Sequence, residues 1–320
     1  MMTPIKYIVT IVLFFCLHTT FAQYDSKDWI IRKTQMYSPG SAMLLNLYDR
    51  IPSSLSVDMG GSVVSTSKNG DTYEYLDLDN YETALHSMST NVHEIGHGYG
   101  GVMYFQEANR AIDGARINFR NINQGFYQTP QEYFWIEIEK AYIFPSRKLT
   151  GTIPGDMRTF RFNTYINGNS STQQHGVIGL LDEMNAYYLG SKYDYDMLPV
   201  YKEVYGPKYL DKWVMETSSS MTAYFEFDFF VKEYLLYAKN YQPQTYNYLR
   251  NNHAFKSTYQ KIHNKFKQVV DLYESKVNRE KAIASFNYDS PFHDDDYNRL
   301  VSRLNSGIYH TIEYDFLDSY

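Results

Sequence analysis

The sequence predicts an α+β fold in which a small N-terminal sheet precedes a mostly helical remainder. Three patterns support this: short β-branched runs between turn residues before residue 77, apolar residues at helical spacing in 81–104, and long helical patterns after residue 195. Of the 320 residues, 43% are hydrophobic and 21% are charged. These proportions are typical of a folded globular protein of one large domain or two packed subdomains.

The first 22 residues have the pattern of a secretory signal peptide. Lys6 precedes an apolar run from Tyr7 to Leu17, and Ala22 offers a small residue for cleavage before Gln23. The run is short for a membrane span, although an uncleaved N-terminal anchor is the alternative and the only route to a membrane that the sequence suggests. We therefore expect a secreted or periplasmic protein.

Cysteine and charge narrow the possible chemistry. Cys16, the only cysteine, lies inside the predicted signal, so we expect neither disulfides nor a catalytic thiol in the mature chain. Any metal would then be held by His, Asp or Glu. A formal net charge of −6 gives no basic footprint for nucleic acid.

The N-terminal region is expected to contain one hairpin and one helix. Residues 62–66 and 72–76 are strand-like and flank the turn signal Asn69-Gly70. A helix is predicted from Tyr81 to about residue 104, and Gly98 with Gly100-Gly101 favours its end shortly after His97.

Further along, Pro130 is expected to begin a helix that runs to Phe144, after an irregular stretch at 106–128. Residues 146–172 are interpreted as loop or strand, and 176–189 as a helix. The last part is expected to be helical near 218–239, 253–276 and 294–305. We divide the chain into residues 1–22 (signal), 23–190 (sheet and catalytic region) and 191–320 (helical subdomain).

The strongest functional pattern is His93-Glu94-Ile95-Gly96-His97 on the predicted helix. Histidines four residues apart lie on one face, one turn apart, so both can bind one metal ion. Glu94 would lie beside the metal and take a proton from metal-bound water. Gly96 costs about 1 kcal/mol in a helix interior, so its presence suggests a close approach by another segment.

The motif needs a third metal ligand. Metzincins place a third histidine where this chain has Met103, so that pattern is incomplete. The segment with Glu183 and Ala186 resembles the second ligand helix of the gluzincin metallopeptidases, in which Glu is followed by a small residue three positions later. The resemblance implies a zincin-like core with Zn²⁺ held by His93, His97 and Glu183, and Glu94 as the general base.

Some roles stay open on the sequence. Thermolysin-like members carry an Asp at the position of Tyr187 to orient the first histidine, so Asp182 and Asn185 become the candidates for that role. His175 is a candidate for the group that stabilises the oxyanion, with Tyr187 and Tyr188 as competitors. The next candidate ligands lie in an aromatic stretch where paired core carboxylates are the favoured interpretation: Glu226 and Asp228.

The leading functional hypothesis is hydrolysis of peptide bonds by zinc-activated water, with a peptide or protein as substrate. Two alternatives remain: an exported binding protein on a degenerate zincin scaffold, and a zinc hydrolase of non-peptide amides.

Overall fold

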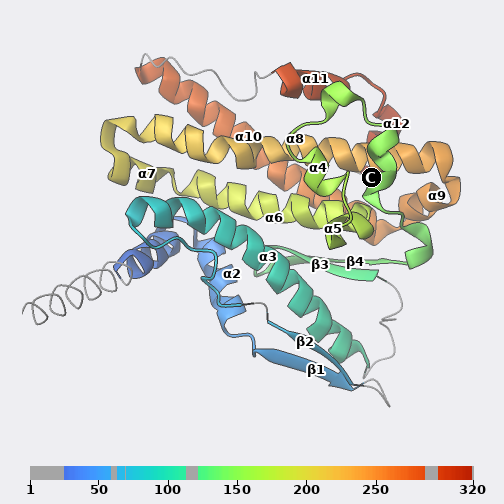
Figure 1. Cartoon of the computed structure of the whole chain (residues 1–320), viewed down its shortest axis with the longest axis horizontal. Helices are drawn as coiled ribbons and strands as arrows, with labels where there is room; N and C mark the ends of the chain where they lie inside the picture. The colour runs from blue at the N-terminus through green and yellow to red at the C-terminus, as the bar shows by residue number, and fades with distance from the viewer. Residues whose placement is uncertain (1–24, 59–62, 69, 113–121, 285–294, 319–320) are drawn as a thin grey trace, which may run out of the picture.

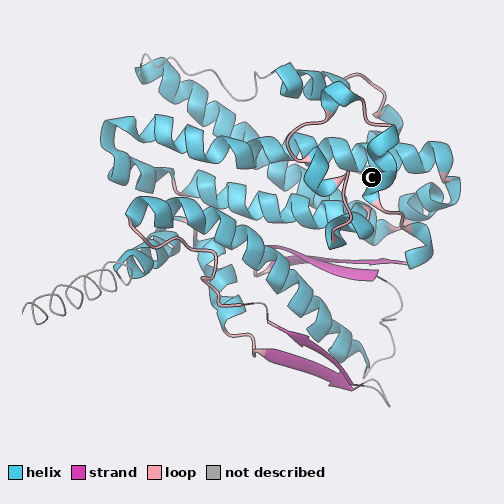
Figure 2. Cartoon of the chain, viewed as in Figure 1, coloured by secondary structure: helices cyan, strands magenta, loops and turns pink. Residues whose placement is uncertain are grey.

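The computed structural model describes residues 25–58, 63–68, 70–112, 122–284 and 295–318. The predicted signal peptide and Cys16 lie outside these residues. The described part is mostly helical and has two antiparallel two-stranded sheets (Figure 2), which agrees with the expected combination of small sheets and a large helical part. No helix within it is both long enough and apolar enough to cross a membrane.

Four long helices form the framework (Figure 1): α3 (Tyr81–Ile112), α6 (Val177–Asp196), α8 (Tyr209–Tyr241) and α10 (His253–Ala284). Helix α6 packs against the other three and is buried along most of its length. Because it has apolar residues on nearly all sides, it behaves as a core helix rather than an amphipathic surface helix.

Shorter segments surround this framework. Residues 25–37 are helical. The other short helices are α2 (Pro39–Asp49), α4 (Phe162–Tyr165), α5 (Ser171–Gln174), α7 (Leu198–Tyr205), α9 (Pro243–Asn251), α11 (Asp295–Leu304) and α12 (His310–Phe316). The 3₁₀ helices are η1 (Lys140–Tyr142), η2 (Ser146–Gly151), η3 (Gly155–Met157) and η4 (Gly206–Lys208).

The N-terminal hairpin pairs β1 (Ser54–Asp58) with β2 (Val63–Ser67). The strand predicted at 62–66 is therefore confirmed within one residue, but its predicted partner at 72–76 is wrong. Residues 72–75 form turns because Asn91 binds their backbone: its side-chain amide donates to the carbonyl of Thr72 at 3.0 Å and accepts from the amide of Tyr75 at 3.4 Å.

The helix predicted from Pro130 to Phe144 is also wrong. The chain forms a second hairpin of β3 (Ile122–Thr129) and β4 (Glu132–Ile138), with Pro130 in the turn. In β4 the side chains of Phe134, Ile136 and Ile138 are buried in alternation with more exposed neighbours. This period of two is the strand signal in the sequence, and aromatic and β-branched residues favour it.

Helix α3 does not end after His97 as predicted but continues to Ile112. Its glycines make room for neighbours. A Cβ on Gly100 would lie 2.8 Å from the carbonyl oxygen of Gly125 in β3, and a Cβ on Gly98 would lie 3.0 Å from the ring of Tyr48. Close packing of the hairpin and α2 against α3 therefore explains glycines that resemble a helix end.

Helix α6 begins at Val177, one residue after the expected start, and runs past the expected end at residue 189 to Asp196. The helices expected near 218–239, 253–276 and 294–305 are confirmed as α8, α10 and α11. The division at residue 190 stays a prediction.

Candidate metal centre

The site lies where α3 and α6 pack together. Each helix has a glycine at this contact: a Cβ on Gly96 would lie 2.7 Å from Cδ1 of Leu189, and a Cβ on Gly190 would lie 3.2 Å from the carbonyl oxygen of Ser89. The hydroxyl of Ser89 donates to the carbonyl of Gly190 at 3.2 Å. The close approach that Gly96 suggests in the sequence is thus present, and its neighbour is α6.

Three polar atoms converge at this contact, from His93 and His97 on α3 and from Glu183 on α6. The two Nε2 atoms are 3.2 Å apart. Oε2 of Glu183 lies 3.7 Å from Nε2 of His93 and 3.5 Å from Nε2 of His97. A tetrahedral ion with bonds of about 2.0–2.2 Å separates its ligands by about 3.3–3.6 Å, so the three atoms have the spacing of one face of such a site.

The carboxylate of Glu183 is consistent with an ion at this place. Its Oε1 atom accepts a hydrogen bond from Thr172 at 3.0 Å. Its Oε2 atom, which faces the histidines, is buried and has no hydrogen-bond partner. A buried acceptor without a partner costs on the order of 1–3 kcal/mol, and a bound cation would remove that cost. The group His93, His97 and Glu183 can therefore hold a metal ion.

Asp182 fixes the orientation of one histidine. Its Oδ2 atom lies 2.9 Å from Nδ1 of His97, and its Oδ1 atom accepts from the side-chain amide of Gln124 in β3 at 3.2 Å. The sequence made Asp182 a candidate for orienting the first histidine; the structure places it on the second. Asn185, the other candidate, is buried and accepts a hydrogen bond from Gln128.

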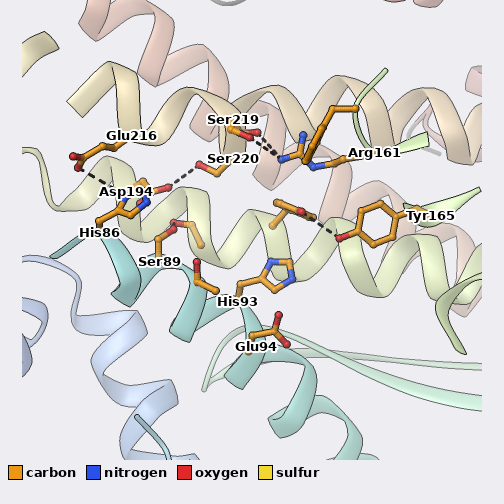
Figure 3. A pocket seen from close by; sticks show the side chains of 14 residues that line it. His86, Ser89, His93, Glu94, Arg161, Tyr165, Asp194, Glu216, Ser219 and Ser220 are labelled. Carbon is orange, nitrogen blue, oxygen red and sulfur yellow. Dashed lines mark hydrogen bonds and ion pairs between the residues drawn. The ribbon is translucent and has the colours of Figure 1, made fainter. Parts of the chain in front are cut away.

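The ring of Tyr187 packs against the ring of His93. The two rings meet edge to face with centroids 4.5 Å apart, and the hydroxyl of Tyr187 is 3.2 Å from that of Tyr165. The guanidinium of Arg161 lies 4.5 Å from the centre of the Tyr187 ring. Figure 3 shows Arg161 and Tyr165 around the same cavity as His93.

Arg161 and Tyr165 were missed by the sequence analysis. Both lie in the 146–172 stretch, which forms short turns and helices and carries no spacing pattern that could single them out. Arg161 is nearly fully buried and pairs with Glu226, with Nη1 and Oε2 2.5 Å apart. Glu226 is thus a paired core carboxylate, as favoured from the sequence. Asp228 is as well, because it pairs with Lys232 at 3.0 Å.

His175 is not brought to this group. It is exposed and forms the C-cap of α5, the short helix before α6. The preceding segment reaches the centre through Thr172, which hydrogen-bonds Glu183. Tyr165 and Tyr187 line the cavity beside His93, and the ring of Tyr187 contacts that of His93, whereas His175 does not line it.

The surroundings of the two histidines shift their pKa values in opposite directions. Burial lowers the pKa of His93 well below its usual value, and the charges of His97 and Arg161 lower it further. Burial also opposes charging of His97, but the carboxylates of Asp182 and Glu183 raise the pKa of His97 well above the usual value. For Glu94, burial raises the pKa, and the charges of Glu183 and Asp182 add to that effect while His97 opposes it.

Glu94 borders two cavities. One of about 360 Å³ extends on the His93 side toward His86. The other, of about 340 Å³, extends on the His97 side between α3 and β2, with Thr66 and Ser67 in its wall. A carboxylate that borders two cavities beside a possible metal site can contact a molecule that enters either of them.

Comparison of the chain with protein-family models, with curated proteins and with solved structures gave no match. The assignment of this centre therefore rests on the geometry of its own residues.

Proposed function

We propose that this protein is a zinc-dependent peptidase. The observation that carries the proposal is the convergence of His93 Nε2, His97 Nε2 and Glu183 Oε2 at separations of 3.2 to 3.7 Å. Two imidazoles and one carboxylate are a ligand set that zinc uses in hydrolytic sites, where a fourth position is left for water. When bound, zinc would supply an activated water and polarise a carbonyl oxygen.

Glu94 is the general base in this proposal. It follows the first ligand directly on α3, and its pKa is raised by burial. A carboxylate of raised pKa holds a proton better than an exposed one, which suits a group that accepts a proton from water and passes it to the leaving amine. Its position between the two cavities supports the same role.

Tyr165 is proposed to donate a hydrogen bond to the oxyanion. Burial, followed by the charge of Glu183, raises its pKa far above that of a free tyrosine, so its hydroxyl stays protonated and able to donate. Tyr187 holds it through the contact between hydroxyls. Donors placed where negative charge develops lower the barrier of acyl transfer. We further propose that residues 1–22 direct export, so that the enzyme acts outside the cell or in the periplasm.

The test uses purified protein loaded with zinc and a mixture of peptides. Glu94→Gln should retain zinc but lose peptide hydrolysis by about 100-fold or more, because the base is absent. Glu82→Gln, at an exposed position in the first turn of the same helix, should behave as wild type. Unchanged hydrolysis in Glu94→Gln, or equal hydrolysis by protein stripped with a chelator, would overturn the proposal.

A further inference from the structure

The two cavities beside Glu94 follow the same helix. Their walls include α3 residues from His86, Ser89 and Thr90 at one end to Gly101 and Val102 at the other. At about 1.5 Å per residue, the helix from His86 to Val102 is about 24 Å long. An extended peptide covers that distance with about seven residues at 3.3–3.6 Å each.

The metal-binding group lies beside the middle of the stretch of α3 from His86 to Val102, and not at its end. His93 borders the first cavity, His97 the second, and Glu94 both. The first cavity continues about 10 Å along α3 beyond His93, and the second about 7 Å beyond His97, at the same rise per residue. A peptide whose scissile bond lies at Glu94 therefore has room for residues on both of its sides.

Among the described residues, the wall of the second cavity has no charged side chain besides Glu94 and His97, and that of the first has Arg161, Asp194 and Glu216 besides Glu94 and the histidines. A charged chain end is bound either by backbone groups or by a side chain of opposite charge close to the reacting bond. The cation next to the centre, Arg161, is paired with Glu226, and its Nη2 atom donates to the carbonyl and hydroxyl of Ser219. Its Nε atom is buried without a partner, but the charge of the guanidinium is already balanced by Glu226. The other carboxylates in the first cavity, Asp194 and Glu216, lie toward its far end with His86 (Figure 3), where Oε2 of Glu216 is buried without a hydrogen-bond partner.

We propose that this centre cleaves internal bonds of extended polypeptides, which bind along α3 on both sides of Glu94. This inference rests on the proposed peptidase function and adds its substrate class. Residues on the His93 side would contact Ser89 and Thr90, and those on the His97 side would lie between α3 and the β2 residues Thr66 and Ser67.

The first experiment measures binding, so that it does not depend on catalysis. Zinc-loaded Glu94→Gln protein is titrated with a peptide of about eight residues, acetylated and amidated at its ends. Thr90→Trp fills the first cavity and Gly101→Trp the second. Both positions are exposed, and a Cβ on Gly101 meets nothing within 4 Å. Gly151→Trp is the matched control, because Gly151 is also exposed and open but borders neither cavity.

Thr90→Trp and Gly101→Trp should each weaken binding of the capped peptide by about tenfold or more, since each removes the contacts on one side of Glu94. Gly151→Trp should leave binding unchanged. If only one of the two cavity-filling variants, Thr90→Trp and Gly101→Trp, weakens binding, the substrate lies on one side of Glu94 and the inference is overturned. Equal binding by all three variants would overturn it as well.

The second experiment measures cleavage with wild-type protein. The capped peptide should be cut at an internal bond, and removal of residues from either end should slow cleavage. If only uncapped peptides are cut, one terminal residue at a time, the inference fails while the proposed peptidase function stands. If zinc-loaded protein cuts neither kind of peptide, the peptidase function fails and the inference fails with it.

Discussion

The Oδ2 atom of Asp182 lies 2.9 Å from Nδ1 of His97. This contact turns the Nε2 atom of the same ring toward Glu183 and His93. A carboxylate on the outer nitrogen of a metal-binding histidine fixes the tautomer and the ring orientation, and it makes the inner nitrogen a stronger ligand. Adjacent residues on α6 thus differ in position: Asp182 orients His97, and Glu183 offers the carboxylate that can hold an ion.

Loss of this carboxylate should weaken the metal site without removing any ligand. Asp182→Ala is expected to lower zinc affinity by about 10- to 100-fold, measured by competition with a chelator of known affinity. Asp211→Asn, which changes an exposed carboxylate on α8, is the control and should bind zinc as wild type does. An unchanged zinc affinity in Asp182→Ala would show that the contact does not support the ligand.

The glycines of α3 allow a graded test of packing. Gly100→Ala should destabilise the protein, because the new Cβ would lie 2.8 Å from a backbone oxygen of β3 that cannot move by itself. Gly96→Ala should cost less, since it meets the end of the flexible Leu189 side chain. Gly101→Ala has open space and should stabilise the protein by up to about 1 kcal/mol through helix propensity.

The free energy of unfolding in urea, measured on metal-free protein, checks this order. Gly100→Ala should unfold most easily, Gly96→Ala less easily, and Gly101→Ala least easily. A Gly100→Ala variant as stable as wild type would mean that β3 does not pack against α3 as described.

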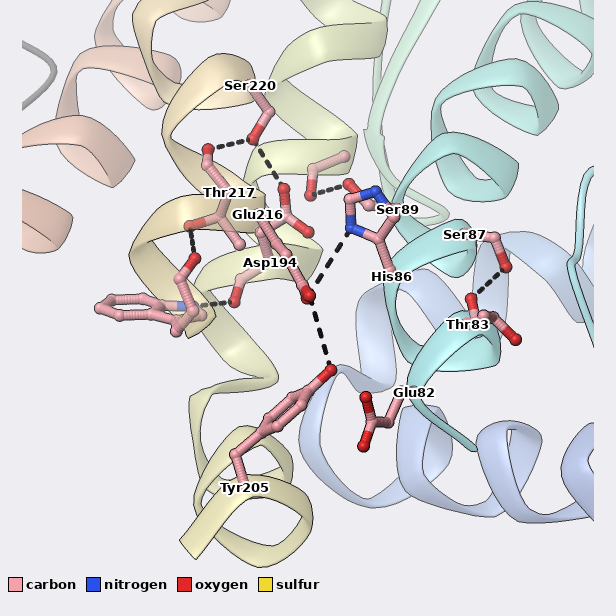
Figure 4. A network of polar contacts seen from close by, with 12 residues as sticks. Glu82, Thr83, His86, Ser87, Ser89, Asp194, Tyr205, Glu216, Thr217 and Ser220 are labelled. Carbon is pink, nitrogen blue, oxygen red and sulfur yellow. Dashed lines mark hydrogen bonds and ion pairs between the residues drawn. The ribbon is translucent and has the colours of Figure 1, made fainter. Parts of the chain in front are cut away.

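Asp194 should make stability depend on pH. Burial raises the pKa of Asp194 to about 7, although hydroxyls of Ser220 and Ser89 oppose this and Glu216 adds to it. Figure 4 shows the hydrogen bond from Ser220, at 2.7 Å. Because the folded state favours the protonated acid, its contribution to stability is present below the unfolded pKa of about 4 and is lost as the pH rises through about 7.

Asp194→Asn keeps an acceptor for Ser220 and removes the titration. Between about pH 4 and pH 8, wild type should therefore lose roughly 2–4 kcal/mol more stability than the variant. Urea unfolding across this range in the presence of a chelator measures the difference, with Asp211→Asn as the control. Parallel pH profiles for wild type and Asp194→Asn would contradict a buried, protonated Asp194.

The parts of the fold and site that were predictable from sequence are those set by local pattern. His93 and His97 share a face because helical periodicity requires it, and Gly96 indicates the contact with α6. The pairing of Glu183 with them spans 86 positions from His97 and came from a resemblance in one short segment. It could not come from periodicity, since nothing local links α3 to α6.

The errors have one physical cause. Glycines in α3 and the proline before β4 are strong local signals, and tertiary packing overrides them. Gly100 faces a β-strand backbone and not a helix end, while Pro130 lies in a hairpin turn. Arg161 and Tyr165 reach the centre from irregular backbone, where side-chain direction follows from long-range contacts and not from sequence spacing.

Anomalous diffraction from a crystal at the zinc absorption edge tests whether His93, His97 and Glu183 bind one zinc ion. We expect a single peak per chain, at about 2.0–2.2 Å from Nε2 of both histidines and from a carboxylate oxygen of Glu183. A zinc ion bound by other residues, or at the histidines with Glu183 turned away from it, would contradict the account.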